Sequence, residues 1–153
     1  MQPNAAARYQ TQQIMTASPA RLVSMLYDRA LRALRDTVRA IEEGDIHARY
    51  THNEKATEII THLWSTLDTD KGGEIARNLS ELYRFMLKRL SVVNIRNDAG
   101  AAREVIGLLE PIAASWRELA ANGGNAPAPC DPQSGGAPYA AGPDQRSPVA
   151  VSA

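Results

Sequence analysis

The strongest constraint on the fold of this 153-residue sequence is an apolar residue every three or four positions from residue 18 to residue 121. This spacing places side chains on one face of an α-helix. Ala, Leu, Arg and Glu are plentiful and aromatic residues are few, which also favours helices. The residues that the spacing places in the core are Val23, Leu26, Tyr27, Ala30, Leu34, Val38, Ile41, Ala56, Ile59, Ile60, Leu63, Leu67, Ile75, Leu79, Leu82, Met86, Leu90, Val93, Ala102, Val105, Leu109, Ile112, Trp116 and Leu119.

Capping residues divide this region into four helices. Serine and aspartate cap free N–H groups at helix starts, proline suits the first helical position, and glycine ends helices in the left-handed conformation. Pro111, inside the last helix, predicts a mild kink or a local bulge. The expected helices run from Ser18-Pro19 to Gly44, from Asp45 to about Leu67, from about Glu74 to Ile95, and from Asp98 to just before Asn122.

Four helices of similar length joined by short polar breaks predict an all-α fold, an antiparallel four-helix bundle. Residues 1–17 are polar with a few apolar residues and are expected to form a flexible N-terminal arm. Residues 122–153 contain six prolines, five glycines and only three charged residues, so we expect a disordered Pro/Gly/Ala-rich tail. The domain prediction is therefore an arm at 1–17, a bundle at 18–121 and a tail at 122–153.

Bulk properties exclude several classes of partner. Lys plus Arg and Asp plus Glu both number 17, and this balance argues against a nucleic-acid partner, which needs clustered basic charge. No apolar run reaches the roughly 20 residues that span a bilayer, so no membrane insertion is expected. Residues 1–8 lack the pattern of a secretory signal, and Cys130 is the only cysteine. A cytoplasmic protein of the cytosol fits these properties best.

The sequence contains no recognisable catalytic or metal-binding motif. His47 and His52 are five residues apart, whereas a helical metal pair needs three or four, and Glu58 to His62 is one residue longer than the di-iron motif. Surface histidines are the simpler interpretation. We therefore expect no enzyme activity, no cofactor, no metal and no small-molecule substrate.

Charged residues on the first helix also have a simple interpretation. Five arginines lie between residues 21 and 39, with Asp28 and Asp36 among them. Asp28 and Arg32 have the i,i+4 spacing of an intrahelical ion pair. The pattern predicts a solvated helix face with internal ion pairs rather than a basic patch.

Some apolar residues lie outside the predicted core stripes. Leu22 and Met25 on the first helix, and Phe85 and Val92 on the third, point away from their stripes, and Trp64 lies at an edge. Broad stripes explain some such residues, because bundle helices often bury more than 100° of their surface. The remainder predict grooves for an amphipathic or extended apolar peptide.

Motifs in this order and spacing resemble the flagellar secretion chaperone family over about residues 9–119. They are Tyr9, Ser18-Pro19, Met25-Leu26-Tyr27-Asp28, Asn53-x-Lys55-Ala56-x-x-Ile59-Ile60, Leu67-Asp68, Gly73-Glu74-Ile75-Ala76-x-Asn78-Leu79, Leu82-Tyr83-x-Phe85-Met86, Arg89-Leu90, Asn94-x-Arg96-Asn97-Asp98 and Ser115-Trp116. The resemblance implies a helical bundle that clamps the C-terminal segment of flagellin, prevents premature polymerisation and delivers it to the export gate of the flagellar type III secretion apparatus. The expected partners are flagellin and an export gate component.

The leftover apolar residues and the resemblance together give a predicted partner-binding set. Its members are Tyr9, Ile14, Leu22, Met25, Leu26, Trp64, Phe85, Val92 and Asn94. One hypothesis is that Tyr9 and Ile14 dock reversibly beside Leu22 and Met25 and move when the client arrives; the alternative is that they extend the core permanently. Two other functions stay open: a structural bundle that self-associates through the same surfaces, and an enzyme with a metal in the bundle core.

Overall fold

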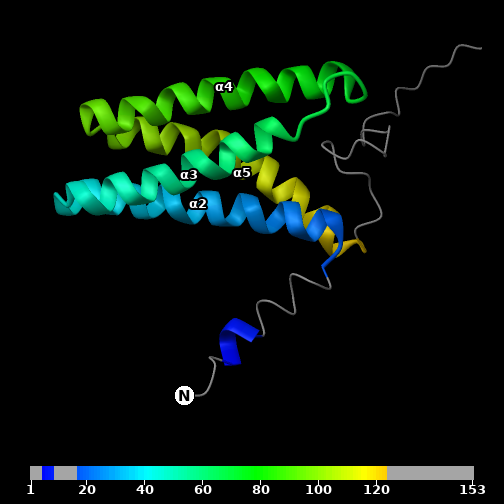
Figure 1. Ribbon diagram of the computed structural model, residues 1–153, viewed down its shortest axis with the longest axis horizontal. Coiled ribbons are helices and arrows are strands. Elements are labelled where there is room, and N and C mark those ends of the chain that lie inside the picture. Colours follow the sequence, from blue (N-terminus) through cyan, green and yellow to red (C-terminus); the bar gives the residue numbers. More distant parts are fainter. Residues whose placement is uncertain (1–4, 9–16, 124–153) are drawn as a thin grey trace, which may run out of the picture.

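The computed structural model describes residues 5–8 and 17–123, and Figure 1 shows its four long helices. These helices are α2 (Pro19–Glu43), α3 (Ile46–Ser65), α4 (Gly73–Arg96) and α5 (Ala99–Ala121). Residues 5–8 form one further helical turn, and the described residues contain no strand. The all-α, helical-bundle prediction is confirmed. The predicted flexible arm at 1–17 and disordered tail at 122–153 fall mostly on residues 1–4, 9–16 and 124–153, which lie outside the described residues.

Local capping interactions set the helix ends. The Ser18 hydroxyl accepts a hydrogen bond from the backbone N–H of Arg21, and Pro19 opens α2. Gly44 ends α2 with φ at 73°, a left-handed conformation that glycine adopts readily. The side chains of Asp45 and Asp98 cap α3 and α5 in the same manner as Ser18 caps α2. These predicted ends are confirmed.

A tight turn connects α3 to α4. The Asp68 carboxylate accepts hydrogen bonds from the backbone N–H groups of Asp70 and Lys71, each at 3.0 Å. A Cβ on Gly72 would lie 2.5 Å from the Cβ of Ala76 and 2.8 Å from the Asp68 carbonyl oxygen, so this position requires glycine. Helix α3 ends at Ser65, two residues before the predicted Leu67. The hydroxyl groups of Ser65 and of the C-cap residue Thr66 donate to the backbone carbonyl groups of His62 and Leu63 at this end.

The helices pack in an antiparallel square. Helix α2 contacts α3 and α5 extensively, whereas α4 contacts the same two helices less. Helices α2 and α4 therefore occupy opposite corners of the bundle, as Figure 1 shows. One flank of α4 faces α3 and the other faces α5.

The core contains most of the predicted residues, together with several alanines and two large residues that the spacing missed. Leu34, Ile60 and Leu109 are among the fully buried predicted residues. Leu31 is also fully buried, because α2 packs against two neighbours and buries a wider arc than the predicted stripe. Tyr83 was missed as well. Residues predicted as core but only half-buried are Val23, Leu26, Val38, Ile41, Leu67, Ile75, Leu79, Leu82, Ile112 and Leu119.

Two tyrosines join opposite corners of the bundle. The hydroxyl groups of Tyr27 on α2 and Tyr83 on α4 form a hydrogen bond in the buried centre. Tyr27 also stacks on Trp116 of α5, with ring centroids 6.5 Å apart. Buried tyrosine hydroxyls need partners, and here each ring fills the apolar core while its hydroxyl group is paired.

Three ion pairs, here called the charge ladder, join α2 to α5. Their spacing is seven residues on both helices, and the sign alternates along each helix, so each acidic group faces a basic one. The pairs are Asp28–Arg117 at 2.7 Å, Arg35–Glu110 at 2.7 Å, and Glu42–Arg103. A slip of one heptad would place like charges opposite each other, so the ladder favours this register over its nearest alternative.

The predicted intrahelical ion pair on α2 is wrong for Asp28, which pairs with Arg117 instead of Arg32. The Arg117 guanidinium group on the neighbouring helix α5 lies within ion-pair distance of the Asp28 carboxylate, whereas Arg32, one turn further along α2, does not. Asp36 and Arg39 do pair within α2, at 3.3 Å.

Helix α5 continues through Pro111 without a break or a π-type bulge. Pro111 and Gly107 are both exposed, so water can solvate the carbonyl group that the proline leaves without its helical donor.

Candidate functional site

A surface hollow in the described residues lies on α4. Ile75, Asn78, Leu79 and Leu82 line a space of about 460 Å³. Phe85 is 42% exposed and lies one turn beyond Leu82 on the same side of the helix. We call these five residues the α4 groove. The groove is apolar except for Asn78, so it suits an apolar segment of another chain.

The α4 groove lies on the flank of α4 that faces α5. Arg89 of α4 donates to Glu104 of α5 at 2.5 Å, and this pair fixes the register of the two helices. Phe85 and Val92 lie four residues before and three residues after Arg89, so both share its flank. On α5, Leu108 lies one turn after Glu104 and is half-buried. The α4 groove therefore starts at Phe85, one helical turn before the Arg89–Glu104 ion pair.

The predicted residues of α2 lie on another part of the bundle. Leu22 is exposed, whereas Met25 and Leu26 are half-buried. Since α2 occupies the corner opposite α4, these three residues do not join Phe85 and Val92 in one surface. Tyr9 and Ile14 lie outside the described residues.

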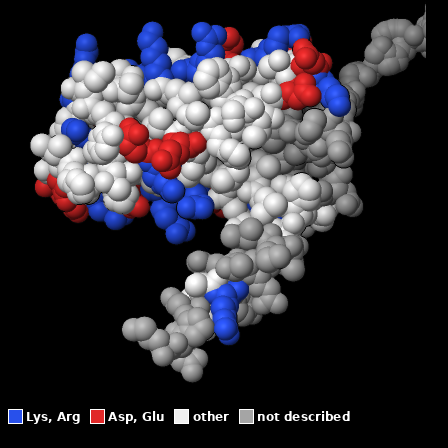
Figure 2. All heavy atoms as spheres, viewed as in Figure 1, with Lys and Arg blue, Asp and Glu red and all other residues white. Residues whose placement is uncertain are grey.

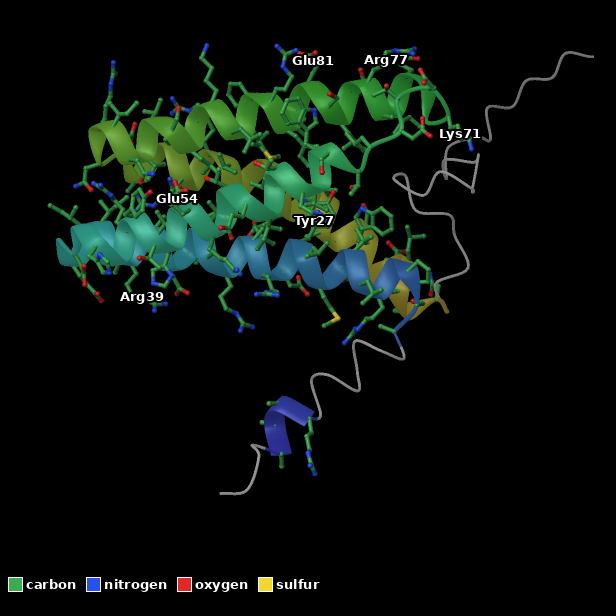
Figure 3. The ribbon with its side chains drawn as sticks, in the orientation of Figure 1. Tyr27, Arg39, Glu54, Lys71, Arg77 and Glu81 are labelled. Carbon is green, nitrogen blue, oxygen red and sulfur yellow. The ribbon has the colours of Figure 1, made fainter. Side chains whose placement is uncertain are left out.

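Trp64 and Asn94 lie between α3 and α4, on the flank of α4 away from Phe85. The Trp64 Nε1–H donates to the Ser80 hydroxyl group at 2.9 Å. Asn94 Nδ2 donates to the Glu54 carboxylate at 3.4 Å, and Figure 3 shows Glu54 between α3 and α4. The nine predicted partner-binding residues therefore occupy several surfaces, and their role in binding stays a prediction.

The helical spacing of apolar residues did not single out three residues that are apolar and exposed in the structure. Ile46 and Tyr50 lie on α3 and Ile95 lies near the end of α4. Ile46 and Tyr50 are spaced i,i+4 and lie off the stripe centred on Ala56 and Ile60. The reasoning that singled out Phe85 would therefore have found them had it been applied to the start of α3.

Metal-binding clusters and membrane-spanning helices are both absent from the described residues. Within residues 5–8 and 17–123, no three His, Cys, Asp or Glu side chains come close enough to hold a metal ion. In the same part of the chain, no helix is both long and apolar enough to cross a membrane. Several charged side chains form surface ion pairs, such as Glu81 with Arg84 at 2.9 Å, and Figure 3 shows Glu81 and Arg77 on the outer side of α4.

Comparison with known proteins identifies the class. The profile of the family described as Flagellar protein FliS matches residues 1–123. The flagellar secretion chaperone FliS of Salmonella typhimurium is 48% identical over 107 residues, covering 69% of this chain and 79% of that protein. The proteins of the same name from Campylobacter jejuni and Bacillus subtilis are 37% and 33% identical, covering 72% of this chain each and 87% and 81% of their own lengths.

The fold and the matches place this protein among helical-bundle chaperones. The matched region includes the whole of the bundle. The chain belongs to the FliS family of flagellar secretion chaperones. Membership of this family favours a binding role over a catalytic one and implies partners among flagellar proteins. The resemblance inferred from the motifs is confirmed.

Proposed function

We propose that this protein binds the C-terminal segment of flagellin in the cytosol, prevents its premature polymerisation and supports its delivery to the flagellar type III secretion apparatus through an export gate component. The family relationship supports a flagellar client. The observation that carries the proposal is the α4 groove, a hollow lined by apolar side chains and continued by the exposed ring of Phe85.

The energetics of such a groove suit a client that is unfolded when free. Burying one apolar side chain contributes about 1.5–3 kcal/mol. A disordered segment loses conformational entropy on binding, so it needs several such contacts to form a stable complex. The groove offers three aliphatic side chains and one aromatic ring within about three helical turns, and these can accept an amphipathic segment with apolar residues at i, i+3 or i+4, and i+7.

A pull-down with purified protein tests the proposal. The full chain is immobilised and incubated with flagellin that retains or lacks its C-terminal segment. We expect retention of intact flagellin only, together with suppression of filament growth in a turbidity assay. Equal retention of the two flagellins would contradict the proposal.

The competing function is self-association through the same apolar surfaces. Analytical ultracentrifugation of the chain alone distinguishes it from client binding. We expect a sedimentation coefficient that does not change with concentration, and a new, faster species when the flagellin C-terminal peptide is attached to a carrier and added. Concentration-dependent oligomers that dissociate on Phe85→Asp would favour self-association instead.

A further inference from the structure

Helix α4 carries the largest excess of positive charge among the four long helices. It has five Lys or Arg and two Asp or Glu side chains, whereas α2 has five and four, α3 has two and two, and α5 has two and three. The whole chain has 17 of each sign, so this excess is local. Figure 2 shows basic side chains in a row along the edge of the molecule that α4 forms. Such a local excess attracts an oppositely charged partner to one side of the molecule.

Four charged residues form one row on the side of α4 that points away from the core. They are Arg77, Glu81, Arg84 and Lys88, and their spacing of four, three and four residues places them on one helical face. All four are exposed, and Figure 3 shows Arg77 and Glu81 on the outer side of the helix. We name this row the α4 ridge.

The α4 ridge contains two cations without an ion pair among residues 5–8 and 17–123. Glu81 lies 2.9 Å from Arg84, so these two charges compensate each other. Arg77 and Lys88 have no such neighbour, whereas Arg89, on the flank facing α5, pairs with Glu104. An exposed cation of this kind can bind a carboxylate of another molecule without first breaking a pair within its own chain.

A polar hollow of about 410 Å³ opens at the start of the α4 ridge. It contains two hydroxyl groups and one amide beside the Arg77 guanidinium group, and these groups together can bind a carboxylate. Two carboxylates also line the hollow, so it does not favour a ligand that is negative throughout. The lining residues are Thr69 and Asp70 of the turn before α4, and Arg77, Asn78, Ser80 and Glu81 of α4.

The mixed sign of this surface favours a protein over a membrane or a nucleic acid. A layer of anionic lipid headgroups and a phosphate backbone are negative throughout and favour clustered basic charge. A polypeptide can instead place carboxylates opposite Arg77 and Lys88 and a neutral or basic group opposite Glu81. At 1.5 Å per residue, Arg77 and Lys88 are about 16 Å apart, which is the length of about three turns of a partner helix.

We propose that the α4 ridge and its hollow bind an acidic segment of a second protein, separate from the client in the α4 groove. The ridge points outward and Asn78 alone lines both hollows, so the two surfaces can be occupied together. Contacts between exposed charges form quickly, are weak and are sensitive to salt. The second protein therefore binds the chaperone transiently. This proposal goes beyond the proposed function and does not depend on it.

Fluorescence anisotropy with a patterned peptide is the first test. The probe is a labelled helical peptide with glutamates at the spacing of Arg77, Arg84 and Lys88 and a lysine at the spacing of Glu81. A peptide of the same composition in shuffled order is the control. We expect the full chain to bind the patterned peptide about fivefold more tightly at low salt, with a difference that shrinks as salt rises. Equal affinity for the two peptides would overturn the proposal.

Charge reversal locates the binding surface. Arg77→Glu combined with Lys88→Glu should weaken binding of the patterned peptide about tenfold. Arg29→Glu combined with Arg32→Glu is the matched control, since these α2 arginines are also exposed and have no ion pair among the described residues. The control should bind within about twofold of the wild type, and circular dichroism should show both variants folded. An equal loss in both variants would mean that net charge alone attracts the peptide, and would overturn the proposal.

Two further titrations separate the ridge from other anions and from the client. Vesicles containing phosphatidylglycerol and a DNA duplex should compete with the patterned peptide poorly; efficient competition by either would overturn the proposal. Saturating flagellin C-terminal peptide should leave the patterned peptide bound, whereas its displacement would assign the ridge to the client site. A chain that binds the patterned peptide but not the flagellin peptide would retain the ridge and lose the proposed function.

The last test identifies the second protein in flagellated cells of the source organism. A photoreactive amino acid replaces Ser91, which is exposed one turn beyond Lys88 on the same face of α4. We expect a crosslink to a segment with net negative charge in a protein other than flagellin, and its loss when Arg77→Glu and Lys88→Glu are added. Crosslinks to flagellin alone, or to a segment without net negative charge, would overturn the proposal.

Discussion

Helix α5 packs against α2 on one flank and against α4 on the other, and the two interfaces differ. On the α2 side, three ion pairs of the charge ladder are spaced one heptad apart. On the α4 side, one pair, Arg89–Glu104, is followed by the half-buried Leu108 and by the apolar α4 groove. The α2/α5 interface is continuous along its length, whereas the α4/α5 interface leaves apolar surface uncovered.

This difference distinguishes an interface that stabilises the fold from an apolar surface that is free to contact a partner. An interface that is fully packed within the chain has no apolar area left to bury against a partner. Helix α4 packs less against its neighbours than α2 does, and the flank of α4 that faces α5 carries the exposed ring of Phe85. The closest helix packing in the bundle is therefore that of α2 against α3 and α5, whereas α4 contributes buried core residues but makes less extensive contacts with its neighbours.

The largest expected effect comes from a core truncation in α2. Leu34→Ala should lower the free energy of unfolding by about 2–5 kcal/mol, because Leu34 is fully buried and its removal leaves a cavity. Leu82→Ala, at the half-buried edge of the α4 groove, should lower it by about 1 kcal/mol and weaken client binding. Urea unfolding and calorimetry measure both quantities. Equal destabilisation by the two variants would remove the distinction between the regions.

A charge in the groove should affect binding more than folding. Phe85→Asp should weaken binding of the flagellin C-terminal segment by about 2 kcal/mol, roughly thirtyfold, since an exposed aromatic anchor is lost. The free energy of unfolding should change by less than about 1 kcal/mol. A loss of stability above about 3 kcal/mol would show that Phe85 belongs to the core.

The charge ladder can be tested by reversing the charge of one residue and then that of its partner. Arg35→Glu places two carboxylates opposite each other and should lower stability by about 0.5–1 kcal/mol, a small effect because both partners are half-exposed. Adding Glu110→Arg should restore most of the loss, and high salt should diminish the whole effect. Arg39→Glu, whose partner Asp36 lies within α2, is the control that Glu110→Arg should not rescue. Independent, additive effects of Arg35→Glu and Glu110→Arg would contradict a direct pair.

The smallest effect is expected outside the bundle. Deletion of residues 124–153 should change the free energy of unfolding by less than about 0.5 kcal/mol and leave client affinity unaltered, because the Pro/Gly/Ala-rich composition offers little apolar surface. Circular dichroism, urea unfolding and peptide titration test this. A clear loss of helicity or affinity would assign the tail to the folded or binding unit.

The helices themselves could be predicted closely. Ser18, Asp45 and Asp98 cap where the sequence placed caps, and Gly44 ends α2 in the left-handed conformation. The largest shift at a boundary is the early end of α3, where the hydroxyl groups of Ser65 and Thr66 bond to carbonyl groups of the preceding turn. Each of these interactions spans at most four residues, so the information is local in the chain.

The candidate site could be predicted only in part. Helical spacing identified Phe85, Val92 and Trp64, because they lie off the apolar stripe of their helix or at its edge. Spacing within one helix does not say which residues of other helices lie beside them. The register of α4 against α5 places Phe85 next to the Arg89–Glu104 pair. The register of α3 against α4 places Trp64 beside Ser80. The same wheel reasoning, not applied at the start of α3, would have included Tyr50.

The sequence alone determined where each helix begins and ends and which face of it is apolar, because helical period and capping depend on near neighbours. The tertiary structure alone decided what faces each flank. It paired Asp28 with Arg117 instead of Arg32, and it buried Asn53 against the Leu90 carbonyl with one oxygen unpaired. These contacts join residues 37 and 89 positions apart, and only the packing of one helix against another brings such residues together.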